Sequence, residues 1–312
     1  MSSRPAAPPP IGRLVDIGGY RLHLACQGEG SPTVVMEAAI GETGLLWSLV
    51  QPAVAQRSRG CVYDRAGLGW SDPSPRPRTA ALMVEELQAL LATAEIPGPY
   101  VLVGHSFGGL LVRLYAARYP QEVAGLVLVD AAHEQQYQRA PTEIRELLPQ
   151  LEEQTRQQLE VLKALIVSGS LDAGMLPVPS GLSASAADTF RALVAAGPKH
   201  VETLIAEQQA VGAIHAELAA AQITSLGDLP LMVLSHGQPM AMPGLTEAVN
   251  QAYEQLWQQL QAELAALSSR GRLVVAEGSG HYLQLERPEL VVDAIAEVVT
   301  AARTNQDRTR LR

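Results

Sequence analysis

Ser106 is the residue whose surroundings most clearly point to chemistry. It is the centre of Gly-His-Ser-Phe-Gly at positions 104–108, between a predicted buried strand, "YVLVG", and a predicted helix, "GGLLVRLYAARYP". A sharp turn from strand to helix holds such a serine in a strained conformation, and side chains at the two glycine positions would collide with neighbouring chain. The helix N-terminus also favours the negative charge that develops when the serine attacks. The pattern predicts a nucleophile; the alternative is a glycine-rich turn that only begins a helix.

A nucleophilic serine needs a base, and the chain has seven histidines. His281 stands in "GSGH", after the last predicted strand and before a helix opened by Pro288. Catalytic groups of open α/β sheets gather at the carboxyl ends of the strands, and a glycine-rich loop there can deliver an imidazole to Ser106. His281 is therefore the predicted base. Other histidines lie in a predicted hairpin (His23), in the strand-to-helix turn around Ser106, which we call the elbow (His105), and in a mid-chain insertion (His200 and His215).

Strand and helix patterns alternate along most of the chain, which positions these residues. Continuous valine and leucine runs between helical stretches indicate a mostly parallel sheet covered on both faces. Strands are predicted within residues 12–30 (a hairpin turning at Gly18-Gly19), 31–39, 60–64, 100–104, 124–130, 229–235 and 271–277. Helices are predicted within residues 43–58, 79–95, 108–120 and 245–267, and after Pro288.

The alternation stops between about Ala131 and Thr224, where the chain is rich in Gln, Glu, Ala and Leu and shows no good strand. A structureless loop of this length is improbable in a compact domain, so helices are expected. One amphipathic segment, residues 151–169, is expected to pack one face on the sheet edge and to expose the other. The predicted division is a disordered lead-in at 1–11, a core at 12–133 and 225–303, a helical insertion at 134–224 and a polar tail at 304–312.

Composition excludes several classes of partner and compartment. The chain has 312 residues, 47% of them hydrophobic, and a formal charge of -9, so it offers no basic face for nucleic acid. No apolar run is long enough to span a bilayer, and the Pro-rich start lacks the apolar core of a signal peptide. Cys26 and Cys61 lie in strand-like runs and are expected to be buried free thiols in a reducing compartment. We therefore expect a cytoplasmic protein without membrane binding.

Taken together, these motifs resemble those of the α/β-hydrolase superfamily, over roughly residues 12–135 and 225–303. Besides the elbow and the "GSGH" loop, "YDRAGLGWSDP" is similar to the family's turn after its fourth strand. The resemblance implies an α/β-hydrolase fold, with the helical insertion as a cap between strands six and seven. It also implies structural roles for the residues that fill this turn, which are Asp64, Arg65, Gly67, Gly69 and Ser71.

The loop after the third strand departs from the family pattern. The family's His-Gly-x-Pro is replaced by Glu37, Ala38, Ala39 and Ile40. An oxyanion hole uses backbone N–H groups, so the N–H of Ala39 can still serve beside that of Phe107, the residue after the nucleophile. Glu37 is expected to brace this loop.

The position of the acid also departs from the family. Most members carry it after strand seven, but here that region has no Asp and no Glu before Glu247, and neither Glu247 nor Glu254 is comfortably placed. A subgroup carries the acid at the end of strand six, where this chain has Asp130, 24 residues after Ser106. The order Ser106, Asp130, His281 then matches the superfamily order. Asp130 is the predicted third catalytic residue; the alternative is a strand or loop cap.

The function predicted from this resemblance is a serine esterase that cleaves carboxylic esters or lactones of small to medium size and needs no cofactor or metal. Two alternatives stay open: an amidase or aminopeptidase of the prolyl iminopeptidase type, and a non-catalytic ligand-binding member of the fold. His133 and Glu134 could line a pocket or simply begin the insertion, and His236 has no predicted role. Neither the physiological substrate nor the oligomeric state follows from the sequence.

Overall fold

Eight strands form a single sheet in the computed structural model, which describes residues 6–310, with side chains to residue 305. Across the sheet the strand order is β1-β2-β4-β3-β5-β6-β7-β8. The strands from β4 to β8 in this order are parallel, whereas β2 is antiparallel to β4 and β1 is antiparallel to β2. The strands are β1 (Arg13–Asp16), β2 (Arg21–Gln27), β3 (Thr33–Glu37), β4 (Gly60–Tyr63), β5 (Tyr100–His105), β6 (Val123–Val129), β7 (Leu231–His236) and β8 (Gly271–Ala276). Every predicted strand is therefore present.

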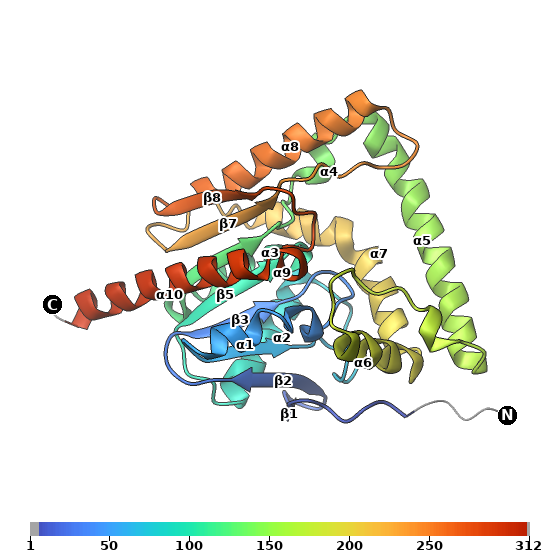
Figure 1. Ribbon diagram of the computed structural model, residues 1–312, viewed down its shortest axis with the longest axis horizontal. Coiled ribbons are helices and arrows are strands. Elements are labelled where there is room, and N and C mark those ends of the chain that lie inside the picture. The colour runs from blue at the N-terminus through green and yellow to red at the C-terminus, as the bar shows by residue number, and fades with distance from the viewer. Residues whose placement is uncertain (1–5, 311–312) are drawn as a thin grey trace.

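Helices cover both faces of the sheet, as the continuous apolar strands require. One face packs against α2 (Ala80–Thr93), α3 (Phe107–Arg118) and the end of α8 (Glu247–Ala266), and the other against α1 (Gln51–Ala55) and α10 (Pro288–Arg310). Figure 1 shows α10 lying across the sheet on the side opposite to α8. These two layers hold the carboxyl ends of the central strands at one edge, where the predicted site residues lie.

Helices also fill the stretch between β6 and β7, as predicted. They are α4 (Gln136–Arg139), α5 (Thr142–Ser168), α6 (Ala184–Ala195) and α7 (Lys199–Ala220), together with the 3-10 helix η3 (Ala173–Met175). The predicted packing of α5 on the sheet edge is wrong. Its end packs against α6 and α7, its start packs against α8, and its middle stands away from the sheet (Figure 1). No helix within residues 6–310 is both long enough and apolar enough to cross a bilayer.

Several shorter segments differ from the sequence predictions. Residues 43–58 form a 3-10 helix, η1 (Gly44–Trp47), followed by the short α1, and a one-turn helix, α9 (Leu283–Glu286), follows the last strand. Helix α10 runs past the predicted boundary at residue 303. In the predicted lead-in, the carbonyl oxygen of Pro8 accepts a hydrogen bond of 2.8 Å from Nε1 of Trp70. The remainder of both predicted terminal segments, residues 1–5 and 311–312, lies outside the described residues.

The two cysteines form a disulfide, so the prediction of free thiols is wrong. Cys26 on β2 and Cys61 on β4 are directly opposite each other in the antiparallel register, with their Cα atoms 4.0 Å apart. Such a pair lies within bonding reach, whereas 35 residues separate the two along the chain. The inference of a reducing compartment rested on free thiols and therefore loses its basis.

Candidate active site

Ser106 lies at a strained turn between β5 and α3, as the motif predicts. Its backbone has φ 51° and ψ -118°, a combination that costs energy outside glycine. A Cβ at Gly104 would lie 2.6 Å from the carbonyl oxygen of Gly108, and one at Gly108 would lie 2.8 Å from that of Ala38. Both glycines are therefore required by the close approach of backbone, and the approach at Gly108 places the start of α3 against the loop after β3.

The end of β6 is fastened directly to this turn. The N–H of Ser106 donates to the carbonyl oxygen of Val129 (3.1 Å), and the carbonyl oxygen of Ser106 accepts from the N–H of Ala132 (2.9 Å). Between these two bonds lies Asp130, fully buried and with a positive φ of 43°. The strand end thus turns so that the Asp130 carboxylate lies next to the elbow.

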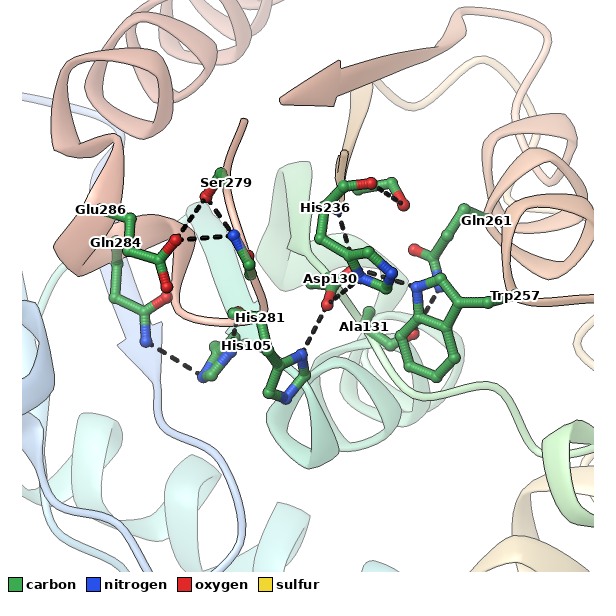
Figure 2. Close-up of polar contacts among 12 residues, drawn as sticks. His105, Asp130, Ala131, His236, Trp257, Gln261, Ser279, His281, Gln284 and Glu286 are labelled. Carbon is green, nitrogen blue, oxygen red and sulfur yellow. Dashed lines mark hydrogen bonds and ion pairs between the residues drawn. The ribbon is translucent and has the colours of Figure 1, made fainter. Parts of the chain in front are cut away.

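His281 reaches the same point from the loop after β8. Its Nδ1 lies 2.5 Å from Oδ2 of Asp130, and its side chain keeps 25% of its surface exposed (Figure 2). The loop is held on both sides. Nε2 of His105, within the elbow, lies 2.9 Å from the carbonyl oxygen of His281, and Oε2 of Glu286 accepts from the N–H of Gly280 at 2.6 Å. His105 therefore has a positioning role that the sequence did not reveal.

The structure brings Asp130 and His281 into contact, but the predicted contact between His281 and Ser106 is not made. Among the described residues, no hydrogen bond joins Oγ of Ser106 to the imidazole of His281. Because Nδ1 of His281 is occupied by Asp130, Nε2 is the ring atom that remains available to the serine. A base oriented in this way is the arrangement that a serine nucleophile requires, and catalytic contacts commonly tighten only when substrate is bound.

Asp130 is shared by two imidazoles, and we call Asp130, His281 and His236 the acid cluster. His236 ends β7, beside β6, and its Nδ1 lies 2.9 Å and 2.8 Å from Oδ1 and Oδ2 of Asp130. Oδ1 also accepts from the backbone N–H of His236 (3.1 Å) and from Nε1 of Trp257 (3.0 Å). Figure 2 shows the two imidazoles and the indole approaching the carboxylate from different sides.

These donors determine the charge of Asp130. Burial alone would raise its pKa, but the hydrogen bonds and charges of His236 and His281 outweigh burial and lower it well below the usual range. Asp130 is therefore a carboxylate that accepts from four N–H groups. Deep burial has the opposite consequence for His105, whose pKa falls to about 3, so that this imidazole is neutral and its hydrogen bond to the His281 carbonyl comes from Nε2–H.

A second buried cluster holds the loop after β3, and we call Arg65, Glu37 and Glu207 the loop cluster. The Arg65 guanidinium donates to Oε1 of Glu37 (2.7 Å) and, through Nε, to Oε1 of Glu207 (2.7 Å). It also donates to the carbonyl oxygens of Ala38 (2.8 Å) and Ala39 (2.7 Å). Glu37 therefore contributes to bracing the loop, as expected.

Helix α7 of the insertion completes this bracing. Oε2 of Glu207 accepts from the N–H of Gly41 (2.8 Å), and Nε2 of His200 lies 3.0 Å from the carbonyl oxygen of Gly41. Burial would raise the pKa of Glu207, but Arg65 lowers it, so the buried carboxylate is ionised. The shape of the loop at residues 38–41 thus depends on a helix that lies more than 150 residues further along the chain.

The backbone N–H groups of Ala39 and Phe107 face no protein acceptor among the described residues. Both residues are buried, with 5% and 4% of their surface exposed. Phe107 is the first residue of α3, where an N–H has no partner within the helix. The two predicted oxyanion donors are therefore unoccupied N–H groups on two segments that touch at Gly108.

Comparison with known proteins identifies the family. Residues 39–294 match the family described as "Alpha/beta hydrolase family". The chain belongs to the alpha/beta hydrolase family. It is 31% identical to the probable transporter efuK of Hormonema carpetanum over 92% of this chain and 42% of that protein, so it spans less than half of that relative's length. It is 27% identical to the uncharacterized protein YqjL of Bacillus subtilis, over 88% of this chain and 87% of that protein.

The solved structures agree with this hydrolase fold. A thermophilic esterase from Thermogutta terrifontis superposes with a TM-score of 0.63 at 20% identity, covering 91% of this chain and 94% of the esterase. At this level of identity the likeness concerns the fold alone. The fold class predicted from the sequence, an α/β-hydrolase sheet covered on both faces, is therefore confirmed.

The structure separates the two alternative acids, Glu247 and Glu254, from Asp130. Glu247 is the exposed first residue of α8, and its Oε1 accepts from Nε2 of Gln251 (2.9 Å). Glu254 reaches the acid cluster only through His236, whose Nε2 lies 3.0 Å from its Oε2. Neither glutamate contacts His281, and Asp130 is the carboxylate that does.

His133 and Glu134 serve structural contacts where the insertion begins. Nδ1 of His133 accepts from the N–H of Gln135 (3.1 Å), and burial lowers the pKa of His133 to about 4. Glu134 forms an ion pair of 2.7 Å with Arg113 of α3. The residues of the "YDRAGLGWSDP" turn are also structural: Asp64 accepts from the N–H groups of Gly44 (2.8 Å) and Trp70 (3.1 Å).

Sequence reasoning missed His236, Trp257 and Glu207. One signal was available: His236 ends a strand next to the one that ends at Asp130, and parallel neighbours bring their carboxyl ends together. Trp257 and Glu254 lie one helical turn apart on α8, and so share a face. Nothing in the local sequence of α7 indicates that Glu207 reaches Arg65.

Asp130, His236 and His281 also place one nitrogen or oxygen each within 4.8 Å of one another. These atoms already act as donors and acceptors to one another, and the second nitrogen of His236 faces Glu254. The three side chains therefore form a hydrogen-bonded cluster.

Proposed function

We propose that this hydrolase cleaves carboxylic esters or lactones of small to medium size through an acyl-enzyme on Ser106. The observation that carries the proposal is the 2.5 Å contact between Nδ1 of His281 and Asp130, beside a serine on a strained strand-to-helix turn. A buried carboxylate, an oriented imidazole and an accessible hydroxyl are the groups that acyl transfer uses.

In the proposed reaction, Nε2 of His281 takes the proton of Ser106 as Oγ attacks the substrate carbonyl carbon. Asp130 fixes the imidazole with its proton on Nδ1 and stabilises the imidazolium that forms. The same imidazolium gives the proton to the leaving alkoxide as the ester C–O bond breaks. His281 then activates a water molecule, which releases the acyl group and restores Ser106.

The oxyanion of each tetrahedral intermediate is proposed to bind the N–H groups of Ala39 and Phe107. Two features support this role. Both groups lack an acceptor among the residues that the structure describes, and the loop cluster holds the carbonyls of Ala38 and Ala39 so that the loop is fixed before substrate binds. Fixed donors of this kind stabilise developing charge without reorganisation during the reaction.

The space for substrate is proposed to be the cavity of about 620 Å³ between α5 and α7. Ile40, the neighbour of Ala39, is one of its lining residues, along with Leu148 and Ile205 from the insertion. This volume is within the usual range for small-molecule sites, and the insertion is proposed to act as a cap over it. A larger cavity of about 870 Å³ lies at the opposite edge of the sheet, beside Pro99 and Pro230, where no site residue is present.

A serine nucleophile distinguishes this proposal from other chemistry on the same fold. Displacement of a halide requires an aspartate whose alkyl ester water can hydrolyse, and the elbow here carries Ser106 instead. Cleavage of amides by an aminopeptidase would need a carboxylate in the pocket to hold a free amine. Glu152 and Glu153 do line the α5–α7 cavity, so amide substrates belong in the test.

The test is a parallel assay of p-nitrophenyl esters of short and medium acyl chains, a simple lactone and aminoacyl p-nitroanilides, with Ser106→Ala as the control. We expect turnover of the esters or the lactone, little turnover of the anilides, and loss of all turnover in the variant. Faster cleavage of the anilides would favour the aminopeptidase. Turnover retained by Ser106→Ala would refute the proposed nucleophile.

A further inference from the structure

The side chain of His236 is enclosed between two carboxylates. It is fully buried at the end of β7, with Nδ1 2.8 Å from Oδ2 of Asp130 and Nε2 3.0 Å from Oε2 of Glu254. The indole of Trp257 stacks on the imidazole, with ring centroids 5.7 Å apart and planes at 30°. Both ring nitrogens therefore face oxygen atoms that belong to acids.

The chemistry of these contacts specifies the protons on His236. An ionised carboxylate only accepts hydrogen bonds, so each contact needs an N–H on the imidazole side, and a neutral imidazole has only one. Asp130 is ionised because Oδ1 of this buried carboxylate receives the backbone N–H of His236 and the indole N–H of Trp257, two donors that do not depend on any histidine proton. Glu254 accepts a second bond from Nε2 of Gln258 (2.8 Å), as expected of a carboxylate. Two N–H groups on one ring make an imidazolium.

We propose that His236 is a positioning residue that stays protonated from about pH 6 to pH 8, and that its positive charge acts across the shared Asp130 to oppose protonation of His281. This inference rests on the proposed function, in which His281 must begin each cycle as a neutral base. A cation on the far side of Asp130 opposes a second cation on the near side. His281 can therefore act as a neutral base at a lower pH than it could if His281 were the only histidine bound to Asp130.

The groups around His236 are consistent with this charge. Burial alone would lower the pKa of His236, but the hydrogen bonds and charges of Asp130 and Glu254 raise it to about 9. Tyr253 of α8 is also nearby, and its pKa is raised by burial, by the neighbouring Tyr137 and by the two acids, so that it stays neutral.

The groups that face His281 are different. Besides Asp130, they are the neutral His105, the hydroxyl of Tyr282, and Glu42 on the loop after β3. Burial raises the pKa of Glu42 to about 7 and raises the pKa of Tyr282 above its usual range. His236 is therefore the one histidine of the acid cluster whose second nitrogen also has a carboxylate partner among the described residues.

The first experiment measures histidine protonation directly and needs no substrate. In ¹⁵N-labelled protein, with His236 identified by comparison with His236→Asn, both ring nitrogens of His236 should carry protons from about pH 6 to pH 8. The titration midpoint of His281 should move up by about one pH unit in His236→Asn, because a unit charge a few ångströms away is lost. An unprotonated ring nitrogen on His236 in this range, or an unmoved His281 midpoint, would overturn the proposal.

The second experiment follows the same charge through activity. The acid limb of the kcat/KM profile should move up by about one pH unit in His236→Asn. It should not move in His215→Asn, which removes another largely buried histidine, one whose Nδ1 lies 3.2 Å from the carbonyl oxygen of Glu134. Equal acid limbs in wild type and His236→Asn would overturn the proposal, because a purely structural role lowers the rate without moving its pH dependence.

A milder variant keeps the question answerable if His236→Asn does not fold. Glu254→Gln leaves His236 in place but replaces the charged partner of Nε2 with a neutral amide, so the pH at which His236 loses a ring proton should fall by at least one unit. An unchanged value would overturn the assignment of the charge to the two carboxylates. If the protein hydrolysed no substrate at all, the protonation measurements would remain readable, so failure of the proposed function is distinguishable from failure of this inference.

Discussion

The acid cluster, together with the adjoining Glu254, and the loop cluster have the same plan, in which a buried cation lies between two carboxylates. In the first, His236 lies between Asp130 and Glu254; in the second, Arg65 lies between Glu37 and Glu207. The difference is in the cation. Arginine keeps its proton at every accessible pH, whereas His236, whose pKa is raised to about 9, loses its proton in alkaline solution.

This difference matches what each cluster controls. The loop cluster holds carbonyl oxygens and so fixes the backbone shape of residues 38–41, a task that a constant charge performs well. The acid cluster holds the imidazole of His281, whose proton must move during the proposed reaction. A titratable cation beside it links the state of the base to pH. Geometry and protonation are therefore controlled by separate clusters at the same edge of the sheet.

The largest expected effect, a loss of kcat, comes from a substitution at the centre of the acid cluster. Asp130→Asn should lower kcat by about ten-thousand-fold while the protein still folds, because the amide cannot hold the required tautomer of His281 or stabilise its charge. Glu247→Gln, at an exposed glutamate, should leave kcat nearly unchanged. Steady-state kinetics with circular dichroism as the folding control measures both. Near-full activity in Asp130→Asn, together with loss of activity in Glu247→Gln, would show that Glu247 and not Asp130 is the catalytic acid.

The next effect breaks the loop cluster. Glu207→Gln leaves Arg65 with one carboxylate fewer and should lower the free energy of unfolding by about 3 kcal/mol. It should lower kcat by roughly 10- to 100-fold through misplacement of the Ala39 N–H, without moving the pH profile.

A matched control for this variant lies on the same helix. Glu202→Gln, at an exposed residue of α7, should change the free energy of unfolding by less than about 0.5 kcal/mol. Urea denaturation compares the two. A shifted acid limb in Glu207→Gln would contradict the separation of the two roles.

The smallest effect sharpens the comparison through pH. Because the pKa of His236 is raised to about 9 in the folded protein, from about 6.5 when unfolded, its charge stabilises the fold fully below about pH 6.5. That contribution, roughly 3 kcal/mol, should disappear as the pH rises through about 9. The difference in unfolding free energy between wild type and His236→Asn, measured from pH 6 to 9.5, should therefore shrink. A constant difference would indicate that His236 is neutral.

Much of the fold could be predicted from the sequence because its signals are local. Continuous valine and leucine runs marked the central strands, and Gly18-Gly19 marked the hairpin of β1 and β2. Thr79 does cap α2 by accepting from the N–H of Leu82. The cysteine pair was mispredicted because Cys26 and Cys61 become neighbours only through the pairing of β2 with β4. The packing of α5 was mispredicted because its buried stripe meets α6, α7 and α8, and an amphipathic pattern does not say which apolar partner it meets.

The candidate site shows the same division. Ser106 and His281 lie in short glycine-containing motifs, so each could be predicted from its immediate sequence neighbours. The role of Asp130 could be predicted only from two observations together: no acid closely follows β7, and Asp130 itself ends β6. His236 and Glu207 have no local motif at all, because their roles depend on which groups the fold brings to each end of the side chain.

Labelling with a fluorophosphonate tests the central claim, that Asp130 and His281 activate Ser106, most directly. Intact-protein mass spectrometry should find one adduct per wild-type chain, located on Ser106 by peptide mapping, and none on Ser106→Ala. The labelling rate should fall by several orders of magnitude in Asp130→Asn. Absence of labelling in the wild type, or an unchanged rate in Asp130→Asn, would contradict the account.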